Sequence, residues 1–194
     1  AADITVQTNL LEARLVAGDK VLFAELSRRY DEALDARTFF KAKRLEQEQR
    51  YARYNDTPYA LEPNCKESPG GLRDLQMLGW IARAASLGRN WRDLARHRLI
   101  TGSEASDLRK IERFLQHVRI RLHYLTGRAE DRVLFDHQEK LARIMGIEPT
   151  GAKRASEVFM QRYYLTAKMV TQLNTILLQN YGSVIFADRG AAIV

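Results

Sequence analysis

The sequence predicts an all-α protein, an up-down helical bundle with one long loop rich in proline and glycine. Three observations predict this fold. Apolar residues recur every three or four positions along most of the 194-residue chain, which is the spacing of a buried helical face. Most of the eleven glycines fall between these periodic segments, and three of the four prolines lie within residues 58–69. We find no convincing alternation of apolar and polar residues, and Val184-Ile185-Phe186 is the only short apolar run of β type.

The first part of the chain reads as three helices. The first covers about residues 4–17 and ends at Gly18. Asp19 can cap the second, because its carboxylate can accept the unpaired N–H groups of a first turn. The third, about residues 36–54, is dense in charge and low in mean hydropathy, so we expect much of it to be solvated. The apolar residues of the second helix are Val21, Leu22, Leu26, Tyr30 and Leu34. The alternative for the third helix is a docking surface for a partner protein or for nucleotide phosphates, formed by its basic residues Lys41, Lys43, Arg44, Arg50 and Arg53.

Residues 55–70 cannot form a regular helix, because prolines stand at positions 58, 63 and 69. A long irregular loop inside a compact domain is often functional. Gly71 then leads into a helix that continues to about residue 82, and a shorter helical piece contains Trp91, Leu94 and Leu99.

Three further helices complete the expected bundle, at about residues 101–126, 131–145 and 150–181. Thr101-Gly102-Ser103-Glu104 opens the first of them, and a seam of apolar residues follows at steps of three and four. We expect one helical domain over residues 1–182 and a tail or linker over 183–194. The apolar seam consists of Leu108, Ile111, Leu115, Val118, Leu122 and Leu125. The last helix has a stripe of apolar residues that we expect to be buried, which consists of Phe159, Tyr163, Ala167, Val170, Leu173 and Leu177.

Composition narrows the classes of partner and location. Lys and Arg number 31 against 24 for Asp and Glu, which gives a formal charge of +7. This excess suits nucleotide phosphates or an acidic partner protein, whereas no nucleic-acid motif accompanies it, so we expect no nucleic-acid partner. The single cysteine, Cys65, cannot pair within the chain and suits the cytoplasm. A run of about 18 apolar residues and a signal-peptide pattern are both absent from the sequence, so we expect no membrane partner.

The run Lys-Glu-Ser-Pro-Gly-Gly-Leu-Arg-Asp, residues 66–74, is the candidate nucleotide-binding motif. Its Gly-Gly pair opens a helix, so the backbone could approach a ligand closely while free N–H groups of the first turn attract phosphate. Its two acidic residues, Glu67 and Asp74, would orient the neighbouring cations. The alternative is a Pro-Gly turn whose charges face water, and spacing alone favours that alternative, because the run is neither a Walker loop nor a dinucleotide fingerprint. The candidate nucleotide-binding residues are Lys66, Gly70, Gly71 and Arg73.

A second candidate surface lies on the helix expected for residues 101–126. Four basic or imidazole residues recur every four positions there and share one helix face, opposite the apolar seam. Most such stripes are only solvated, and the alternative is a docking surface for a partner protein or for nucleotide phosphates. The candidate docking residues are Arg109, Arg113, His117 and Arg121.

No metal-binding or nucleophilic constellation is visible. The four histidines do not stand at metal-ligand spacing, and Cys65 has no neighbouring base. We therefore expect neither a catalytic residue nor a metal ligand. The histidines, which we interpret as structural or surface residues, are His97, His117, His123 and His137.

Residues 61–82 closely resemble the central region of the bacterial PII uridylyltransferase/uridylyl-removing enzymes. Residues 8–18, 127–138 and 159–164 are similar to the same family, so the resemblance covers nearly the whole chain. The Lys-Glu-Ser-Pro-Gly-Gly-Leu-Arg-Asp run is its most specific part. A related run occurs in the glutamine synthetase adenylyltransferases, which are the nearest alternative family.

The resemblance implies the fold of a nucleotidyltransferase substrate-binding domain. In that family a nucleotidyltransferase domain precedes the helical region, and a metal-dependent HD hydrolase domain and two ACT regulatory domains follow it. The implied reaction transfers UMP from UTP to a tyrosine hydroxyl of the PII nitrogen-regulatory protein, and a second activity removes the UMP. The implied partners are PII, UTP and UMP, and the adjacent nucleotidyltransferase and HD domains, with Mg²⁺ held by the nucleotidyltransferase domain.

We do not expect either catalytic centre of that family in this stretch. Gly102-Ser103 is followed by Asp107 but by no Asp-x-Asp pair that could hold two metal ions. The HD domain needs an adjacent His-Asp, and the chain offers only Asp136-His137 in the reverse order. The region by itself is therefore expected to be inactive.

Two alternatives remain beside the nucleotide-binding hypothesis. The region could be a purely structural bundle that relays regulation between catalytic domains, or, less favoured, a nucleic-acid-binding bundle. The Gly70-Gly71 turn distinguishes the nucleotide-binding hypothesis from the structural one, because a purely structural bundle has no need for a cationic Gly-Gly turn beside a proline-rich loop.

Overall fold

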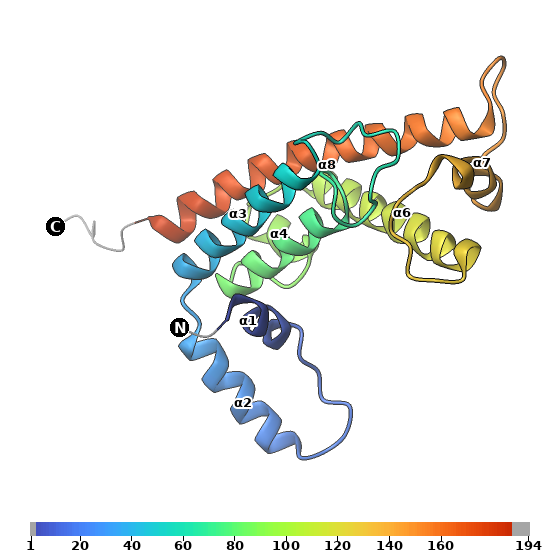
Figure 1. Cartoon of the computed structure of the whole chain (residues 1–194). Coiled ribbons are helices and arrows are strands. Elements are labelled where there is room, and N and C mark those ends of the chain that lie inside the picture. The colour runs from blue at the N-terminus through green and yellow to red at the C-terminus, as the bar shows by residue number, and fades with distance from the viewer. Residues whose placement is uncertain (1–2, 188–194) are drawn as a thin grey trace.

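The computed structural model describes residues 3–187, and within that range the chain folds into eight helices with no β-strand, which confirms the all-α prediction (Figure 1). None of the described helices combines the length and the apolar character needed to cross a membrane. The helices are α1 (Ile4–Leu11), α2 (Lys20–Ala33), α3 (Ala36–Arg53), α4 (Leu72–Ala84), α5 (Trp91–Arg96), α6 (Gly102–Thr126), α7 (Phe135–Ile144) and α8 (Ala155–Phe186).

The bundle is built along α8, whose 32 residues extend over about 48 Å. Helices α3 and α4 pack against it toward its C-terminal end, and α7 packs against it near its start (Figure 1). The apolar stripe predicted for this helix is buried at all six positions, which confirms that periodicity identified the inward face.

Helix α4 lies at the centre of the bundle and packs against α1, α3, α6 and α8. Its apolar residues therefore face more than one neighbour, and eight of its thirteen residues are buried. On α6 the predicted seam is buried from Leu108 to Leu122, whereas Leu125 near the end of the helix is partly exposed. The core is thus continuous from α3 to α7 among the described residues.

Side-chain caps fix several helix starts where the sequence predicted them. Asp19 accepts the N–H groups of Val21 and Leu22 at the start of α2. At the start of α6, Thr101 and Glu104 form a reciprocal capping box, which satisfies two otherwise unpaired N–H groups. These caps are local, so the sequence alone located them.

The first predicted helix is too long. It ends at Leu11 rather than near residue 17, and the residues that follow are exposed, with Val16 at 86%. A short helix is stable only when packing supports it, and none of residues 12–19 is buried. Helix α2 has no buried residue; Val21 and Leu22 stay exposed, and the helix projects from the bundle (Figure 1).

The helix predicted for residues 131–145 begins later, at Phe135, because residues 131–133 are used in an extended pairing. The N–H of Cys65 donates to the carbonyl of Asp131 at 2.8 Å, and the N–H of Val133 donates to the carbonyl of Pro63 at 2.9 Å. Asn64 and Arg132 consequently form an antiparallel bridge. This bridge anchors the proline-rich loop to the segment before α7.

The last helix is displaced by about five residues from the prediction, and it includes Val184-Ile185-Phe186, so the β-type interpretation of that run is wrong. The ring of Phe186 packs edge-on against Phe40 of α3, with centroids 5.6 Å apart, and Arg37 donates to the carbonyl of Ile185. Packing against α3 therefore extends the helix. The expected tail over 183–194 begins inside α8, and residues 188–194 of it lie outside the described residues.

Candidate functional site

The site is organised by Asn64, which folds the loop before α4 into a tight turn. Its side-chain carbonyl accepts the N–H groups of Lys66 at 3.0 Å and Glu67 at 2.8 Å. Its backbone carbonyl accepts the N–H of Ser68 at 3.0 Å, and its own N–H donates to the Ser68 hydroxyl at 2.9 Å. An asparagine side chain of this kind stabilises a turn by replacing a backbone partner.

The remaining N–H groups of this stretch are also bonded within the protein. Every backbone N–H from residue 64 to residue 74, proline excepted, therefore has an internal acceptor. The prediction that free N–H groups at the start of α4 would cradle phosphate is wrong, because the loop carbonyls already accept them. The donor and acceptor pairs are Gly70 to the Asp74 carboxylate, Gly71 to Ser68, Leu72 to Cys65, Arg73 to Lys66 and Asp74 to Gly71.

The two glycines serve this turn and its contact with α8. Gly70 has a φ of +80°, and a Cβ on it would lie 2.4 Å from the carbonyl oxygen of Ala167 in α8. A Cβ on Gly71 would lie 2.8 Å from the carbonyl oxygen of Lys66. Backbone does approach backbone closely at this motif, and the approaching partner in the structure is the protein's own chain.

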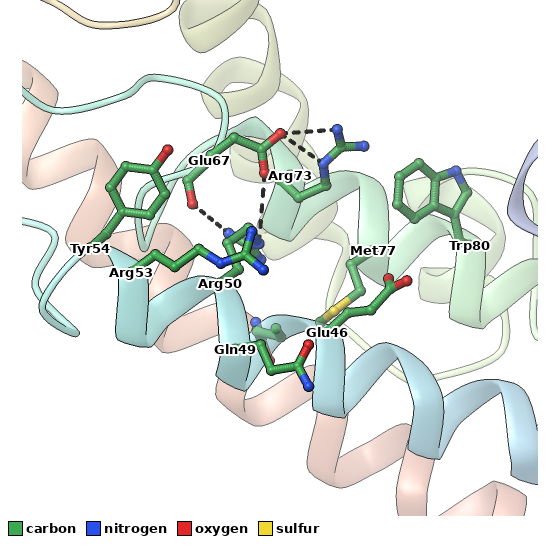
Figure 2. Close-up of a pocket in the computed structure, with 10 residues that line it drawn as sticks. Glu46, Gln49, Arg50, Arg53, Tyr54, Glu67, Arg73, Met77 and Trp80 are labelled. Atoms are coloured by element: carbon green, nitrogen blue, oxygen red, sulfur yellow. Dashed lines mark hydrogen bonds and ion pairs between the residues drawn. The ribbon is translucent and has the colours of Figure 1, made fainter. Parts of the chain in front are cut away.

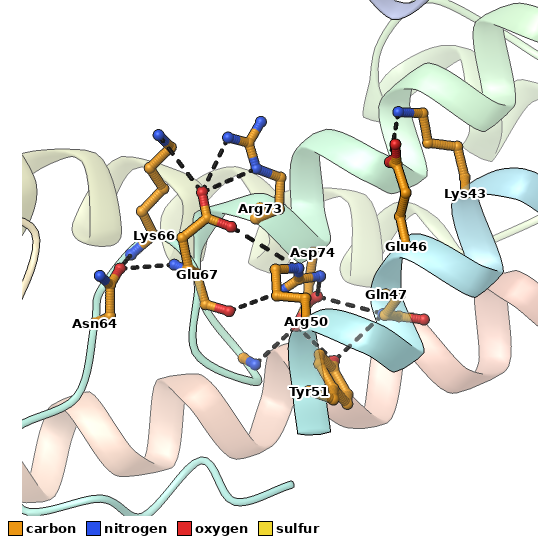
Figure 3. A network of polar contacts seen from close by, with 11 residues as sticks. Lys43, Glu46, Gln47, Arg50, Tyr51, Asn64, Lys66, Glu67, Arg73 and Asp74 are labelled. Atoms are coloured by element: carbon orange, nitrogen blue, oxygen red, sulfur yellow. Dashed lines mark hydrogen bonds and ion pairs between the residues drawn. The ribbon is translucent and has the colours of Figure 1, made fainter. Parts of the chain in front are cut away.

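Asp74 lies at the centre of a polar network in the core, with 0% of its surface exposed (Figure 3). Its carboxylate accepts hydrogen bonds from Arg50 at 2.5 Å and from the Tyr51 hydroxyl at 2.7 Å, both on α3. It also accepts the Gly70 N–H at 2.7 Å and a longer bond from Gln47 at 3.3 Å. Burial raises the pKa of Tyr51, and the Asp74 charge raises it further, so the phenol stays protonated and donates. The carboxylate of Asp74 is thus aimed at α3, away from the two cations it was predicted to orient.

Glu67 is the carboxylate that does join those cations. Lys66 lies 3.5 Å from it and Arg73 lies 3.0 Å from it, and Arg50 approaches its other oxygen at 3.9 Å (Figure 3). Partial burial opposes ionisation of Glu67, but the hydrogen bond from Arg73 and the three cationic charges outweigh it and hold its pKa below the usual range. The structure therefore brings Lys66, Glu67 and Arg73 together at the surface.

A hollow of about 410 Å³ opens beside this cluster, between α3 and α4 (Figure 2). Arg50, Arg53 and Arg73 line it together with Glu67, whereas Lys66 lies outside its lining. No carboxylate pairs with the Arg53 side chain anywhere in residues 3–187, so its charge is available to a ligand. The wall includes Trp80, whose ring also lies under Arg73 at 5.4 Å.

The sequence predicts the basic residues of α3 to be solvated or to form a docking surface, and it does not connect them with the loop before α4. Lys43, Gln47 and Arg50 are buried on the face that begins with Phe39, so the expectation that the charged helix is mostly solvated is wrong for this face. The signal was present, because positions 39, 43, 47 and 50 follow one helical stripe. Only the position of Asp74 in space shows why polar side chains occupy it.

The four predicted docking residues do not form one continuous surface. Arg109 and Arg113 line a second hollow, between α4, α5 and α6, whereas His117 and Arg121 are exposed outside it. Successive steps of four residues turn the helix by 400°, so each residue is rotated about 40° from the last, and the stripe drifts around α6.

The remaining titratable groups of the described residues form no cluster that could bind a metal ion. Within the described part of the chain, no three His, Cys, Asp or Glu side chains gather closely enough to hold a metal ion. Cys65 is buried, and burial raises the pKa of its thiol to about 12. His123 hydrogen-bonds Asp131 at 2.9 Å, and that carboxylate also accepts from Arg119 at 2.7 Å.

Comparison with known proteins identifies the family. A profile of the GlnD PII-uridylyltransferase family matches residues 38–178, which is most of the chain and includes the loop and α4. The chain belongs to the GlnD PII-uridylyltransferase family. The resemblance inferred from residues 61–82 is therefore confirmed.

The relatives in this family share one description, bifunctional uridylyltransferase/uridylyl-removing enzyme. The relative from Aromatoleum aromaticum is 80% identical over 193 residues, covering 99% of this chain and 22% of that protein. The relative from Bordetella parapertussis is 60% identical over 178 residues, and that from Burkholderia mallei is 57% identical over 184 residues. These alignments cover 92% and 95% of this chain and 21% of each relative, so the chain spans about a fifth of their length. No solved structure matches the chain.

Proposed function

We propose that this chain is the helical domain of a cytoplasmic bifunctional PII uridylyltransferase/uridylyl-removing enzyme and that it supports the transfer of UMP from UTP to a tyrosine of PII. The observation that carries the proposal is the group of four cations around the α3–α4 hollow, Arg50, Arg53, Lys66 and Arg73. Among the described residues, two glutamates line the hollow, Glu67 and Glu46, and Glu46 already pairs with Lys43 at 2.7 Å. The Asp74 carboxylate pairs with Arg50 but is fully buried.

In the proposed reaction the tyrosine oxygen of PII attacks the α-phosphorus of UTP. A new phosphorus–oxygen bond forms, the bond from the α-phosphorus to the oxygen that bridges to the β-phosphate breaks, and pyrophosphate leaves. The phenolic proton of the tyrosine is released to solvent. The family implies a divalent metal, Mg²⁺, for this step, and the described residues offer no cluster that fits one, so we assign the metal to the nucleotidyltransferase domain of the longer protein. This chain contributes positive charge and position.

Lys66 and Arg73 are the proposed contacts with the triphosphate. Both side chains are partly exposed and both lie against Glu67, which holds them close together while no phosphate is bound. Guanidinium groups bind phosphate through paired N–H bonds, and Lys supplies a point charge. Asp74 and Arg50 support this surface from below, because they fix the turn that carries the two cations.

The main alternative is a purely structural bundle that relays regulation between the catalytic domains. The saturated backbone of the loop and the contact of Gly70 with α8 suit such a role as well. A structural role, however, does not require exposed cations that share one carboxylate beside an open hollow.

The test is substitution of the two cations in the full-length enzyme. Lys66→Ala and Arg73→Ala should each lower the rate of UMP transfer about 10- to 150-fold, since a charge-assisted hydrogen bond contributes roughly 1.5–3 kcal/mol. UMP removal should change little, because we assign it to the HD domain. The melting temperature should also change little, since both side chains pair only near the surface.

Arg143→Ala is the matched control. Arg143 pairs with Glu139 at 3.2 Å on α7, away from the hollow, so its loss removes the same kind of charge without touching the site. Transfer rates for Lys66→Ala and Arg73→Ala that equal the Arg143→Ala rate would reject the triphosphate contacts. Equal loss of transfer and removal together with a lowered melting temperature would favour the structural alternative.

A further inference from the structure

A second hollow, of about 710 Å³, lies between α4, α5 and α6. Trp80 lines both this hollow and the one between α3 and α4, but the other α4 residues differ. Arg73 and Met77 line the α3–α4 hollow, whereas Gly79 and Arg83 line the second, so the two border different sides of α4. A volume of this size is typical of pockets that bind small molecules. No step of the proposed uridylyl transfer uses it.

Five arginines line this hollow, and they come from three separate parts of the fold. Two glutamates offset them only in part, because Glu12 lies 3.7 Å from Arg83 and Glu112 already accepts the Trp91 indole N–H at 2.8 Å. Within residues 3–187, no ion pair or hydrogen bond engages the guanidinium groups of the other four arginines. The five arginines are Arg83, Arg89, Arg92, Arg109 and Arg113.

Two buried donors beside the hollow have no acceptor within the described structure. The indole Nε1 of Trp80, a residue that is 7% exposed, is buried without a hydrogen-bond partner. The Nε of Arg83 is also buried without a hydrogen-bond partner. Buried N–H groups normally have acceptors, so the polar groups of this wall are incompletely paired by the described residues alone.

Gly79 adds a third observation. It lies in the interior of α4, where glycine is the poorest helix former after proline, and it lines the hollow. A Cβ at this position would meet no atom within 4 Å, so nothing in the described fold requires glycine there. A glycine without an internal reason leaves the floor of the hollow open.

We propose that this hollow is a binding site for a compact anion with two or more phosphate groups. The arginine fork matches phosphate oxygens in pairs, and arginines from α4, from the residues at and just before the start of α5, and from α6 line this one hollow. An extended acidic peptide would instead follow a line of cations along the surface. The α6 stripe does not provide that line, because His117 and Arg121 lie outside the lining.

The first experiment titrates the 194-residue chain with tripolyphosphate by calorimetry. Arg109→Ala and Arg113→Ala should each weaken binding about tenfold, and the double variant about a hundredfold. Arg121→Ala removes an exposed arginine from the same helix outside the hollow, and we expect it to leave the affinity unchanged. Equal effects of Arg113→Ala and Arg121→Ala would overturn the assignment.

Arg73→Ala separates this site from the proposed triphosphate contacts at the other hollow. Binding to the α4–α5–α6 hollow should survive that substitution and be lost in Arg109→Ala/Arg113→Ala. If the double variant keeps its tripolyphosphate binding and Arg73→Ala loses it, the further site is rejected while the proposed function stands.

Gly79→Leu fills the hollow from its floor. Replacing a helical glycine should raise the melting temperature by about 2–4 °C, since no neighbour clashes. Binding of tripolyphosphate should fall at least tenfold in the same variant, so stability and affinity move in opposite directions. Unchanged affinity in a folded Gly79→Leu protein would contradict a ligand in this hollow.

Two further probes identify the ligand class. Tighter binding of UTP than of tripolyphosphate would assign a nucleotide, and equal or weaker binding would assign a free polyphosphate; both support a phosphate site. A hexaglutamate peptide should bind more weakly than either. Tighter binding of the peptide would overturn the proposal in favour of an acidic protein partner.

Discussion

Single residues determine how the loop before α4 is held. A buried carboxylate is stable only when donors surround it, and Asp74 has them from Arg50, Tyr51, Gln47 and the backbone of Gly70. These donors come from α3 and from the loop itself. Asp74 therefore joins two segments that are 24 residues apart where it meets Arg50.

Loss of this carboxylate should destabilise the fold strongly. Asp74→Ala leaves the buried Arg50 without its nearest charge partner and with Glu67 only at 3.9 Å, so the free energy of unfolding should fall by about 3–5 kcal/mol. Asp107→Ala, which breaks an exposed pair with Lys110, should cost within about 1 kcal/mol. Urea denaturation of the two variants measures both values. A loss for Asp74→Ala as small as that for Asp107→Ala would show that the network contributes little.

Secondary-structure elements meet most closely where the loop contacts α8. The positive φ of Gly70 lets the chain turn, and the absence of a side chain lets its backbone lie against the backbone of Ala167. The same loop is paired with the segment before α7 through Asn64 and Arg132. Contacts with α3, α7 and α8 thus fix the position of the two exposed cations.

Gly70→Ala should therefore disrupt the junction between the loop and α8. The left-handed φ and the overlap with the Ala167 carbonyl together predict a loss of about 2–5 kcal/mol in the free energy of unfolding. Gly102→Ala is the matched control, since a Cβ there meets no atom within 4 Å and the position begins α6. Denaturant unfolding should show the control unchanged or slightly more stable. Equal stability of both variants would mean that α8 yields to the added methyl group.

The whole molecule is a helical scaffold with charged hollows on different sides of α4. Its core is continuous, and the chain covers 22% of the relative from Aromatoleum aromaticum. Within residues 3–187 no acidic or histidine cluster could hold a metal ion.

The isolated 194-residue chain should fold but not catalyse. Circular dichroism should report a predominantly helical protein, because the described core is complete from α3 to α8. With PII, labelled UTP and Mg²⁺, the chain should neither transfer nor remove UMP, while the full-length enzyme assayed in parallel should do both. Incorporation of labelled UMP by the chain, after contaminating enzyme is excluded, would contradict this division of labour.

Local features of the sequence determined the helical content, most helix positions and the place of the loop. The stripe on α8, the seam on α6 and the caps at Asp19 and Thr101 depend on neighbours within a few residues, so they could be predicted without a structure. The cation-bearing motif was found in the same way. Its three surface charges lie close in the sequence: Lys66 and Glu67 are adjacent in the loop, and Arg73 follows Glu67 by six residues, in the first turn of α4.

Only the tertiary structure decided how that motif is used. Asp74 turns toward α3 because its donors Arg50, Tyr51 and Gln47 belong to a segment distant in the sequence. The loop N–H groups are satisfied mostly by acceptors within the loop, but the folded turn that brings these groups together was visible only in the structure. Contacts between segments distant in the sequence also explain why the short apolar run ending at Phe186 is helical and why α7 begins late. Periodicity identifies which face of a helix is buried, but it carries no information about which segment covers that face.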